Sequence, residues 1–77
     1  MKIKVSLFLS LGRFSPEGKR DFEVDLDRDS TIESLLSALA IPFHIERVIL
    51  VNGRHATPET LLSHSDHVTM FPPMSGG

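Results

Sequence analysis

One stretch of this chain, residues 31–40, spaces its large apolar side chains with the period of an α-helix. They recur at intervals of three and four residues, at Ile32, Leu35, Leu36 and Leu39. Ser30 and Glu33 stand where a capping box would begin such a helix, and Pro42 must end it. Because a single helix cannot bury its own apolar stripe, the rest of the chain must supply the surface on which it packs.

The N-terminal third supplies part of that surface as two predicted strands. Apolar side chains alternate with polar ones in both, at Ile3, Val5, Leu7 and Leu9, and again at Phe22, Val24 and Leu26. Residues 11–19 between them hold two glycines and a proline, which indicates a turn. We therefore expect a hairpin within residues 2–27. Acidic residues alternate with the apolar ones in its second strand, as suits the solvent face of an edge strand.

The second half of the chain predicts further strands. Residues 47–51 form a short apolar, β-branched run, and Asn52-Gly53 follows it as a strong hairpin signal. Residues 54–57 can return as a brief strand. A connector at 58–62 is expected to form one helical turn, with Leu61 and Leu62 reaching the core.

The last predicted strand covers residues 67–71, with Val68 and Met70 on its buried face. Pro72 and Pro73 end it, because proline has no N–H for the hydrogen-bond ladder. The element order predicts an α+β fold, in which a mixed sheet of four to five strands carries one main helix on one face. We expect the first and last strands to be central neighbours, a folded domain over residues 1–71, and a flexible C-terminal tail at 72–77.

Composition excludes several classes of function. The chain of 77 residues has no cysteine, so it offers no thiolate nucleophile and no sulfur-rich metal site. Its four histidines are read as surface residues, and no metal site is expected. A net charge of −2 argues against nucleic acid as the main partner. No apolar run reaches the length of a membrane span and the N-terminus lacks a signal peptide, which favours the cytoplasm.

Gly76-Gly77 is the most informative functional signal. Glycines lack Cβ atoms, so a tail that ends in two of them can thread a narrow cleft and present its carboxylate to an enzyme. Pro72 and Pro73 favour an extended course that projects this end away from the domain.

The element order, Val51-Asn52-Gly53 after the third strand and the terminal diglycine resemble the ubiquitin-like β-grasp fold. The ending Phe71-Pro72-Pro73-Met74-Ser75-Gly76-Gly77 is similar to that of the MoaD/ThiS family of sulfur carriers, and within it to small subunits of molybdopterin synthase. The resemblance covers the whole chain.

This resemblance implies a protein that is a cosubstrate and not an enzyme. A ubiquitin-activating-like enzyme would adenylate the Gly77 carboxylate with ATP and Mg²⁺, and a sulfur donor protein would convert it to a thiocarboxylate, with Gly76 lining the same path. The large subunit of molybdopterin synthase would then use the sulfur. The chain itself would bind no cofactor.

A docking surface should accompany the tail. In the expected register, Phe8, Leu50 and Phe71 point to the face of the sheet that the helix leaves open, where large apolar groups suggest a partner site. We expect Pro72, Pro73, Met74 and Ser75 to extend this contact.

Three other functions stay open. The short connection at residues 41–46 is closer to carriers for the thiazole of thiamine. The diglycine would also serve a ubiquitin-like modifier joined to lysines of other proteins. A non-covalent binding module with an idle diglycine is the fourth reading.

Overall fold

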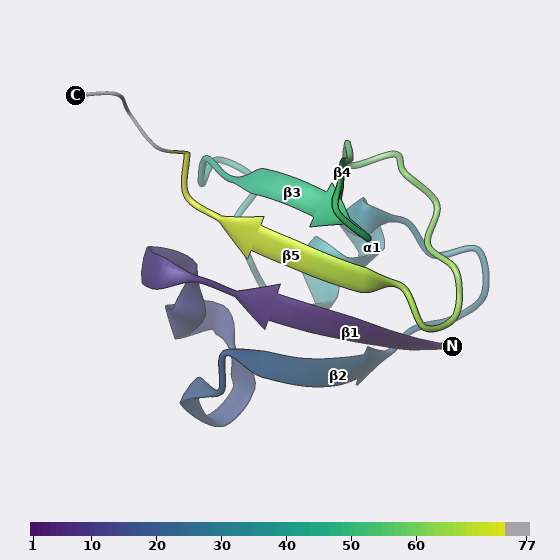
Figure 1. Ribbon diagram of the computed structural model, residues 1–77, viewed down its shortest axis with the longest axis horizontal. Helices are drawn as coiled ribbons and strands as arrows, with labels where there is room; N and C mark the ends of the chain where they lie inside the picture. The colour runs from purple at the N-terminus through teal and green to yellow at the C-terminus, as the bar shows by residue number, and fades with distance from the viewer. Residues whose placement is uncertain (74–77) are drawn as a thin grey trace.

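The computed structural model describes residues 1–73, which form one sheet with one helix packed on it (Figure 1). The elements are β1 (Lys2–Leu7), β2 (Asp21–Asp25), α1 (Ile32–Ala38), β3 (Val48–Val51), β4 (Arg54–His55) and β5 (His67–Phe71). Their order across the sheet is β2-β1-β5-β3-β4. The predicted α+β architecture is confirmed, and the sheet has five strands. Within residues 1–73, no helix is long and apolar enough to cross a membrane.

The first and last strands are central neighbours, as predicted. β1 and β5 run parallel, with Lys4 opposite His67 and Leu7 opposite Met70. All other pairs are antiparallel: β1 with β2, β5 with β3, and β3 with β4. β5 therefore lies between two hydrogen-bonded partners, β1 and β3, so the tail starts from an interior strand of the sheet.

The core fills the space between the sheet and α1. Fully buried side chains come from β1 and β5, which contribute Ile3, Val5, Leu7, Val68 and Met70, and from α1, which contributes Ile32, Leu35 and Leu36. Phe22, Val24, Leu26 and Leu39 pack at the margin of this cluster. The predicted inward faces of both strands and of the helix are thus confirmed, apart from Leu9, and the opposite face of the sheet is left without a covering layer (Figure 1).

The helix begins one residue later than the predicted capping box. Thr31, not Ser30, is the N-cap: its side chain accepts from the N–H of Ser34, whose hydroxyl accepts from the N–H of Thr31. Ser30 is held elsewhere, because its carbonyl accepts from Leu62 N–H at 2.9 Å. The helix ends at Ala38, before the predicted residue 40. Ala40 then has φ of +57° and Ile41 N–H donates to the Leu36 carbonyl, which is a Schellman ending.

The segment after β1 differs from the prediction. Leu9 was expected to continue the buried alternation, but it has φ of +54° and is 74% exposed. It opens a 3₁₀ helix, η1 (Leu9–Phe14), and η2 (Pro16–Gly18) follows where a turn was expected. Leu11 in η1 is buried instead and caps the core at this end. Phe14, at the end of η1, also packs against the core.

Three shorter segments also differ from the prediction. β3 begins at Val48 instead of residue 47, and β4 ends at His55. The hairpin between them is the predicted one, with φ positive at both Asn52 and Gly53. Residues 58–62 form a turn and a single β-bridge between Thr31 and Leu61, not a helical turn. Leu62 is buried as predicted, whereas Leu61 is 64% exposed.

Candidate functional site

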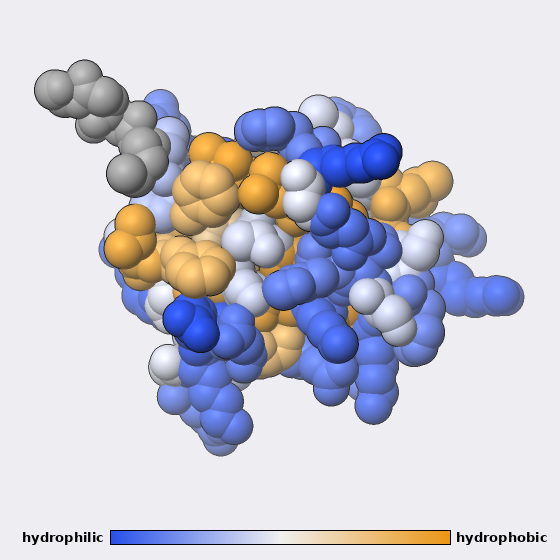
Figure 2. Space-filling view, in the orientation of Figure 1, coloured by the Kyte–Doolittle hydropathy of each residue, from blue (hydrophilic) through white to orange (hydrophobic). Residues whose placement is uncertain are grey.

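The uncovered face of the sheet carries an apolar area at the end where β5 finishes. We call it the tail-side patch and define it by four half-buried side chains, Phe8, Val48, Leu50 and Phe71. Figure 2 shows this face, with hydrophobic side chains gathered next to the point where the described chain ends and hydrophilic side chains over most of the other half.

Strand register brings the patch together. Val48 lies directly opposite Phe71, and Leu50 lies opposite Thr69, one diagonal step from Phe71 on the same face. Phe8 follows buried Leu7 and donates its N–H to the Met70 carbonyl at 3.0 Å, which sets its side chain beside Phe71 on the neighbouring strand.

A cation borders the patch at Phe8. The Arg20 guanidinium lies over the Phe8 ring, with 5.5 Å between Cζ and the ring centroid. Leu9, next to Phe8 in the chain, adds an exposed apolar side chain at the same margin. The margin of the patch at Phe8 therefore combines a cation with an exposed apolar side chain.

The predicted docking residues that the structure describes lie together. Phe8, Leu50 and Phe71 share one face and one end of the sheet. Pro72 is half-buried after β5, and Pro73 is exposed. Four predicted site residues, Met74, Ser75, Gly76 and Gly77, lie outside the described residues. Val48 was missed, although its spacing of two from Leu50 in a predicted strand was a usable signal.

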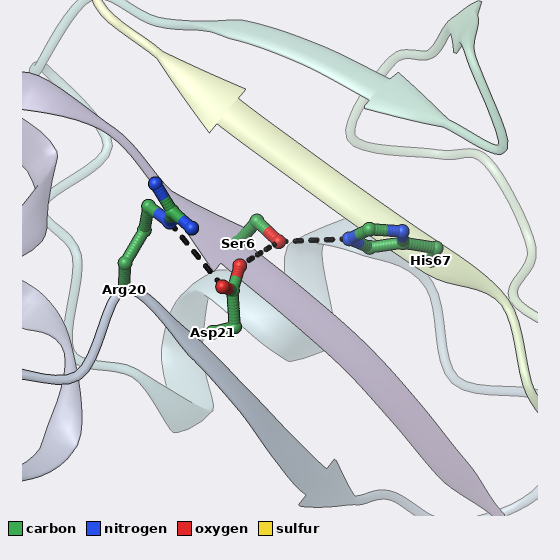
Figure 3. A network of polar contacts seen from close by, with 4 residues as sticks. All are labelled: Ser6, Arg20, Asp21 and His67. Carbon is green, nitrogen blue, oxygen red and sulfur yellow. Dashed lines mark hydrogen bonds and ion pairs between the residues drawn. The ribbon is translucent and has the colours of Figure 1, made fainter.

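A polar network occupies the middle of the same face (Figure 3). Ser6 is buried and its Oγ donates to Asp21 Oδ1 at 2.6 Å, and lies 2.8 Å from His67 Nε2. Arg20 Nε donates to Asp21 Oδ2 at 3.2 Å. Since Ser6 donates its one hydroxyl proton to Asp21, His67 must be the donor to Ser6, which assigns the proton to Nε2. The hydrogen bond from Ser6, with a smaller contribution from Arg20, holds the pKa of Asp21 below its ordinary value.

The network does not form a nucleophilic triad, although it contains serine, histidine and aspartate. A triad places histidine between the other two, so that the base can take the serine proton. Here Ser6 stands in the middle and its proton is already given to Asp21. The network has a structural role, because the Ser6 hydroxyl on β1 is hydrogen-bonded to Asp21 on β2 and to His67 on β5. Sequence reasoning missed it because residues 6, 21 and 67 become neighbours only through strand register.

The four histidines do not gather. Within residues 1–73, no three side chains among His, Cys, Asp and Glu come together as a metal site would require. His64 has a local role, because its Nδ1 accepts from the N–H of Lys2 at 3.0 Å.

The fold is a ubiquitin-like β-grasp: a mixed sheet with parallel central strands, one helix across it, and an open face beside the chain end. The ThiS family model matches residues 11–77. The chain therefore belongs to the ThiS family, whose small ubiquitin-like members are sulfur carriers or modifiers and in general not catalysts. No curated protein matches the sequence.

Solved structures share this fold. Small archaeal modifier protein 1 from Haloferax volcanii is 27% identical with a TM-score of 0.81, and the match covers 100% of both chains. A Pyrococcus furiosus protein assigned as subunit 1 of molybdopterin converting factor is 22% identical with a TM-score of 0.80, covering 95% of this chain and 98% of that one. The Helicobacter pylori complex of subunits 1 and 2 of molybdopterin-converting factor gives 19% identity and a TM-score of 0.67, covering 100% of both chains.

Proposed function

We propose that this protein is a cytoplasmic sulfur carrier for molybdopterin biosynthesis and that it reacts at the Gly77 carboxylate. One observation supports this above the others: Pro72 and Pro73 follow directly on β5, an interior strand that is paired on both edges, beside an uncovered apolar patch. A domain built in this way can aim a short tail and dock next to it.

The proposed chemistry takes place on partner enzymes. A carboxylate is a poor electrophile because its charge is delocalised. A ubiquitin-activating-like enzyme transfers AMP from Mg²⁺-bound ATP to the Gly77 carboxylate and releases pyrophosphate. A persulfide on the sulfur donor protein attacks the acyl adenylate and displaces AMP. Reductive cleavage of the resulting acyl disulfide by a thiol leaves the thiocarboxylate, whose soft sulfur attacks the precursor in the large subunit of molybdopterin synthase.

The tail-side patch serves docking in this proposal. Phe8, Leu50 and Phe71 supply apolar contact, while Pro72, Pro73, Met74 and Ser75 lead the tail into the partner and Gly76 passes its narrowest point. The complex of the two Helicobacter pylori converting-factor subunits shows that a protein with this fold assembles with a second subunit. We infer the same kind of partner for this chain, with no role for nucleic acid or a membrane.

The decisive test is an intact mass. The protein is incubated with the adenylating enzyme, ATP, Mg²⁺ and the sulfur donor, and we expect one carboxyl oxygen of Gly77 to be replaced by sulfur. A variant that lacks Gly77 is the control, and it should stay unmodified while its circular dichroism is unchanged. An unmodified wild-type chain, with an activating enzyme that is competent on another carrier, refutes the proposal.

A ubiquitin-like modifier is the second candidate, because the Haloferax volcanii match is a small archaeal modifier protein. Its mark would be an isopeptide bond from Gly77 to lysines of other proteins, detected by mass spectrometry of cell extracts. The thiazole of thiamine is an alternative destination for the same sulfur, favoured by the match to the ThiS family model. The two pathways are separated by supplying the thiocarboxylate form of the protein to molybdopterin synthase and to thiazole synthase and measuring which product forms.

A further inference from the structure

A hollow lies near the base of the tail, on the opposite side of the sheet from the tail-side patch. Its volume is about 520 Å³, and we call it the Arg47 hollow. Its walls include Phe43, Ile45, Arg47, Ile49, Pro58 and Pro73. Two titratable residues, His44 and Glu46, also line it. Arg47 and Ile49 flank Val48 along the chain, so they project away from the face that carries Val48. Pro73 belongs to the wall, so the tail begins between the hollow and the patch.

The guanidinium of Arg47 is held in the hollow with incomplete pairing. Nη1 donates to the carbonyls of Phe43, at 3.2 Å, and Ile45, at 2.5 Å, and Cζ lies 5.2 Å from the centroid of the Phe43 ring. Nε is buried and has no acceptor among the described residues. Within residues 1–73, no carboxylate lies within 4.0 Å of this half-buried cation. A partly desolvated charge without a counter-ion is costly, and an incoming carboxylate would offset that cost.

The walls suit an apolar segment around that carboxylate. Phe43 is 63% exposed, one of the largest open apolar side chains of the described chain. Aromatic and arginine side chains are the residues that most often anchor protein interfaces. Aromatic surface and cation here form one unit, because the ring and the guanidinium stack on each other.

We propose that the Arg47 hollow receives an Asp or Glu side chain, carried on an apolar segment of the enzyme that adenylates Gly77. This inference rests on the proposed function. A partner that encloses a tail must approach its base from more than one side, and the two surfaces beside Pro73 are the tail-side patch and this hollow. The patch offers apolar contact, while the hollow adds the Arg47 cation. Glu46 lines the same hollow but forms no ion pair with Arg47 within 4.0 Å, so the cation can still receive an acidic group from the partner.

The test compares Arg47→Gln with Arg54→Gln, which removes an exposed arginine from β4 outside the hollow. Affinity for the adenylating enzyme is measured by calorimetry at low and high salt. Truncating one member of a hydrogen-bonded ion pair at an interface weakens binding strongly, so we expect at least a tenfold rise in Kd for Arg47→Gln and less than a twofold change for Arg54→Gln. Thermal melts confirm that both variants are folded.

A second measurement leaves Arg47 in place. With p-benzoylphenylalanine in place of Phe43, irradiation of the complex should cross-link to a partner peptide that contains Asp or Glu. Equal affinities of the two arginine variants, or a cross-link to a peptide without an acidic residue, overturns the inference. The inference also fails if NMR of the free full chain shows that Arg47 Nε–H is already hydrogen-bonded to a carboxylate. The hollow would then be filled by the chain's own carboxylate and not by a partner. If the wild type forms a thiocarboxylate while Arg47→Gln binds normally, only this inference fails.

Discussion

Neighbouring residues Met70 and Phe71 allow the two faces of the sheet to be tested separately. Met70 is fully buried against α1, whereas Phe71 is half-buried on the uncovered face. We predict that Met70→Ala lowers the free energy of unfolding and leaves the affinity of the folded protein for its partner unchanged. Phe71→Ala should chiefly weaken partner binding.

The magnitudes follow from the exposed areas. Removing a buried methionine side chain costs about 3 kcal/mol of stability. A phenylalanine side chain carries roughly 200 Å² of apolar surface. If a partner covers about a third of it, about 65 Å² is removed from water, which is worth about 1.6 kcal/mol, or a fifteenfold change in Kd. The stability lost in Phe71→Ala should be smaller than in Met70→Ala, about 1–2 kcal/mol, because only part of the ring is covered in the free protein.

Urea denaturation measures the change in stability. Calorimetry with the proposed partner, the large subunit of molybdopterin synthase, measures the change in affinity at a temperature where both variants are folded. The reasoning is refuted if Phe71→Ala binds as tightly as the wild type. It also fails if Phe71→Ala loses as much stability as Met70→Ala, since the ring would then belong to the core.

Three further changes test the backbone and the polar network. Ala40→Gly should raise stability by about 0.5–1 kcal/mol in urea denaturation, because glycine relieves the positive φ of +57° at this position; a loss of stability would contradict the Schellman ending. Gly53→Ala should cost about 1 kcal/mol in the same assay, since φ is +84° there, and an unchanged midpoint would rule out the expected strain. Ser6→Ala should raise the pKa of Asp21 toward its ordinary value, read by carboxyl NMR titration. Because the pKa of Asp21 is depressed in the folded state, the ionised carboxylate stabilises the fold above about pH 4, and this stabilisation is lost as the pH falls below that value. The difference in free energy of unfolding between Ser6→Ala and the wild type should therefore become smaller in acid. A difference that does not change with pH would exclude this linkage.

The sequence predicted the sheet and the core well because both depend on periodic patterns. The bounds of β5 were correct at both ends, since alternation from His67 runs into Pro72, which cannot continue a ladder. The inward set of Ile3, Val5 and Leu7 was correct because it follows from the same alternation. The central pairing of β1 with β5 was correct because it follows from the order of the elements.

The errors occurred where two local solutions were almost equal. Ser30 and Thr31 can both cap a helix, and the choice was made by Leu62, whose N–H donates to the Ser30 carbonyl. Leu9 fits the alternation of β1, but the chain turns there, and Leu11 is buried in place of Leu9. Neither contact is visible in a local window of sequence.

The site divides in the same way. Phe8, Leu50 and Phe71 could be assigned to one face because their positions follow from alternation alone. The Ser6 network and the pairing of Arg47 with the carbonyls of Phe43 and Ile45 depend on distant register and on loop conformation. The role of Gly76 and Gly77 stays a prediction.

The pairing of β5 on both edges also has a mechanical consequence. A partner that pulls on the tail pulls β5 along its own axis, whereas the ladder bonds of the antiparallel pairing with β3 lie across that axis. The bonds along β5 are therefore loaded together in shear and do not open one after another, as they would if an edge strand such as β2 were peeled away. In the proposed carrier role, the domain can thus bear tension at the end where partner enzymes would hold it without unravelling from that end.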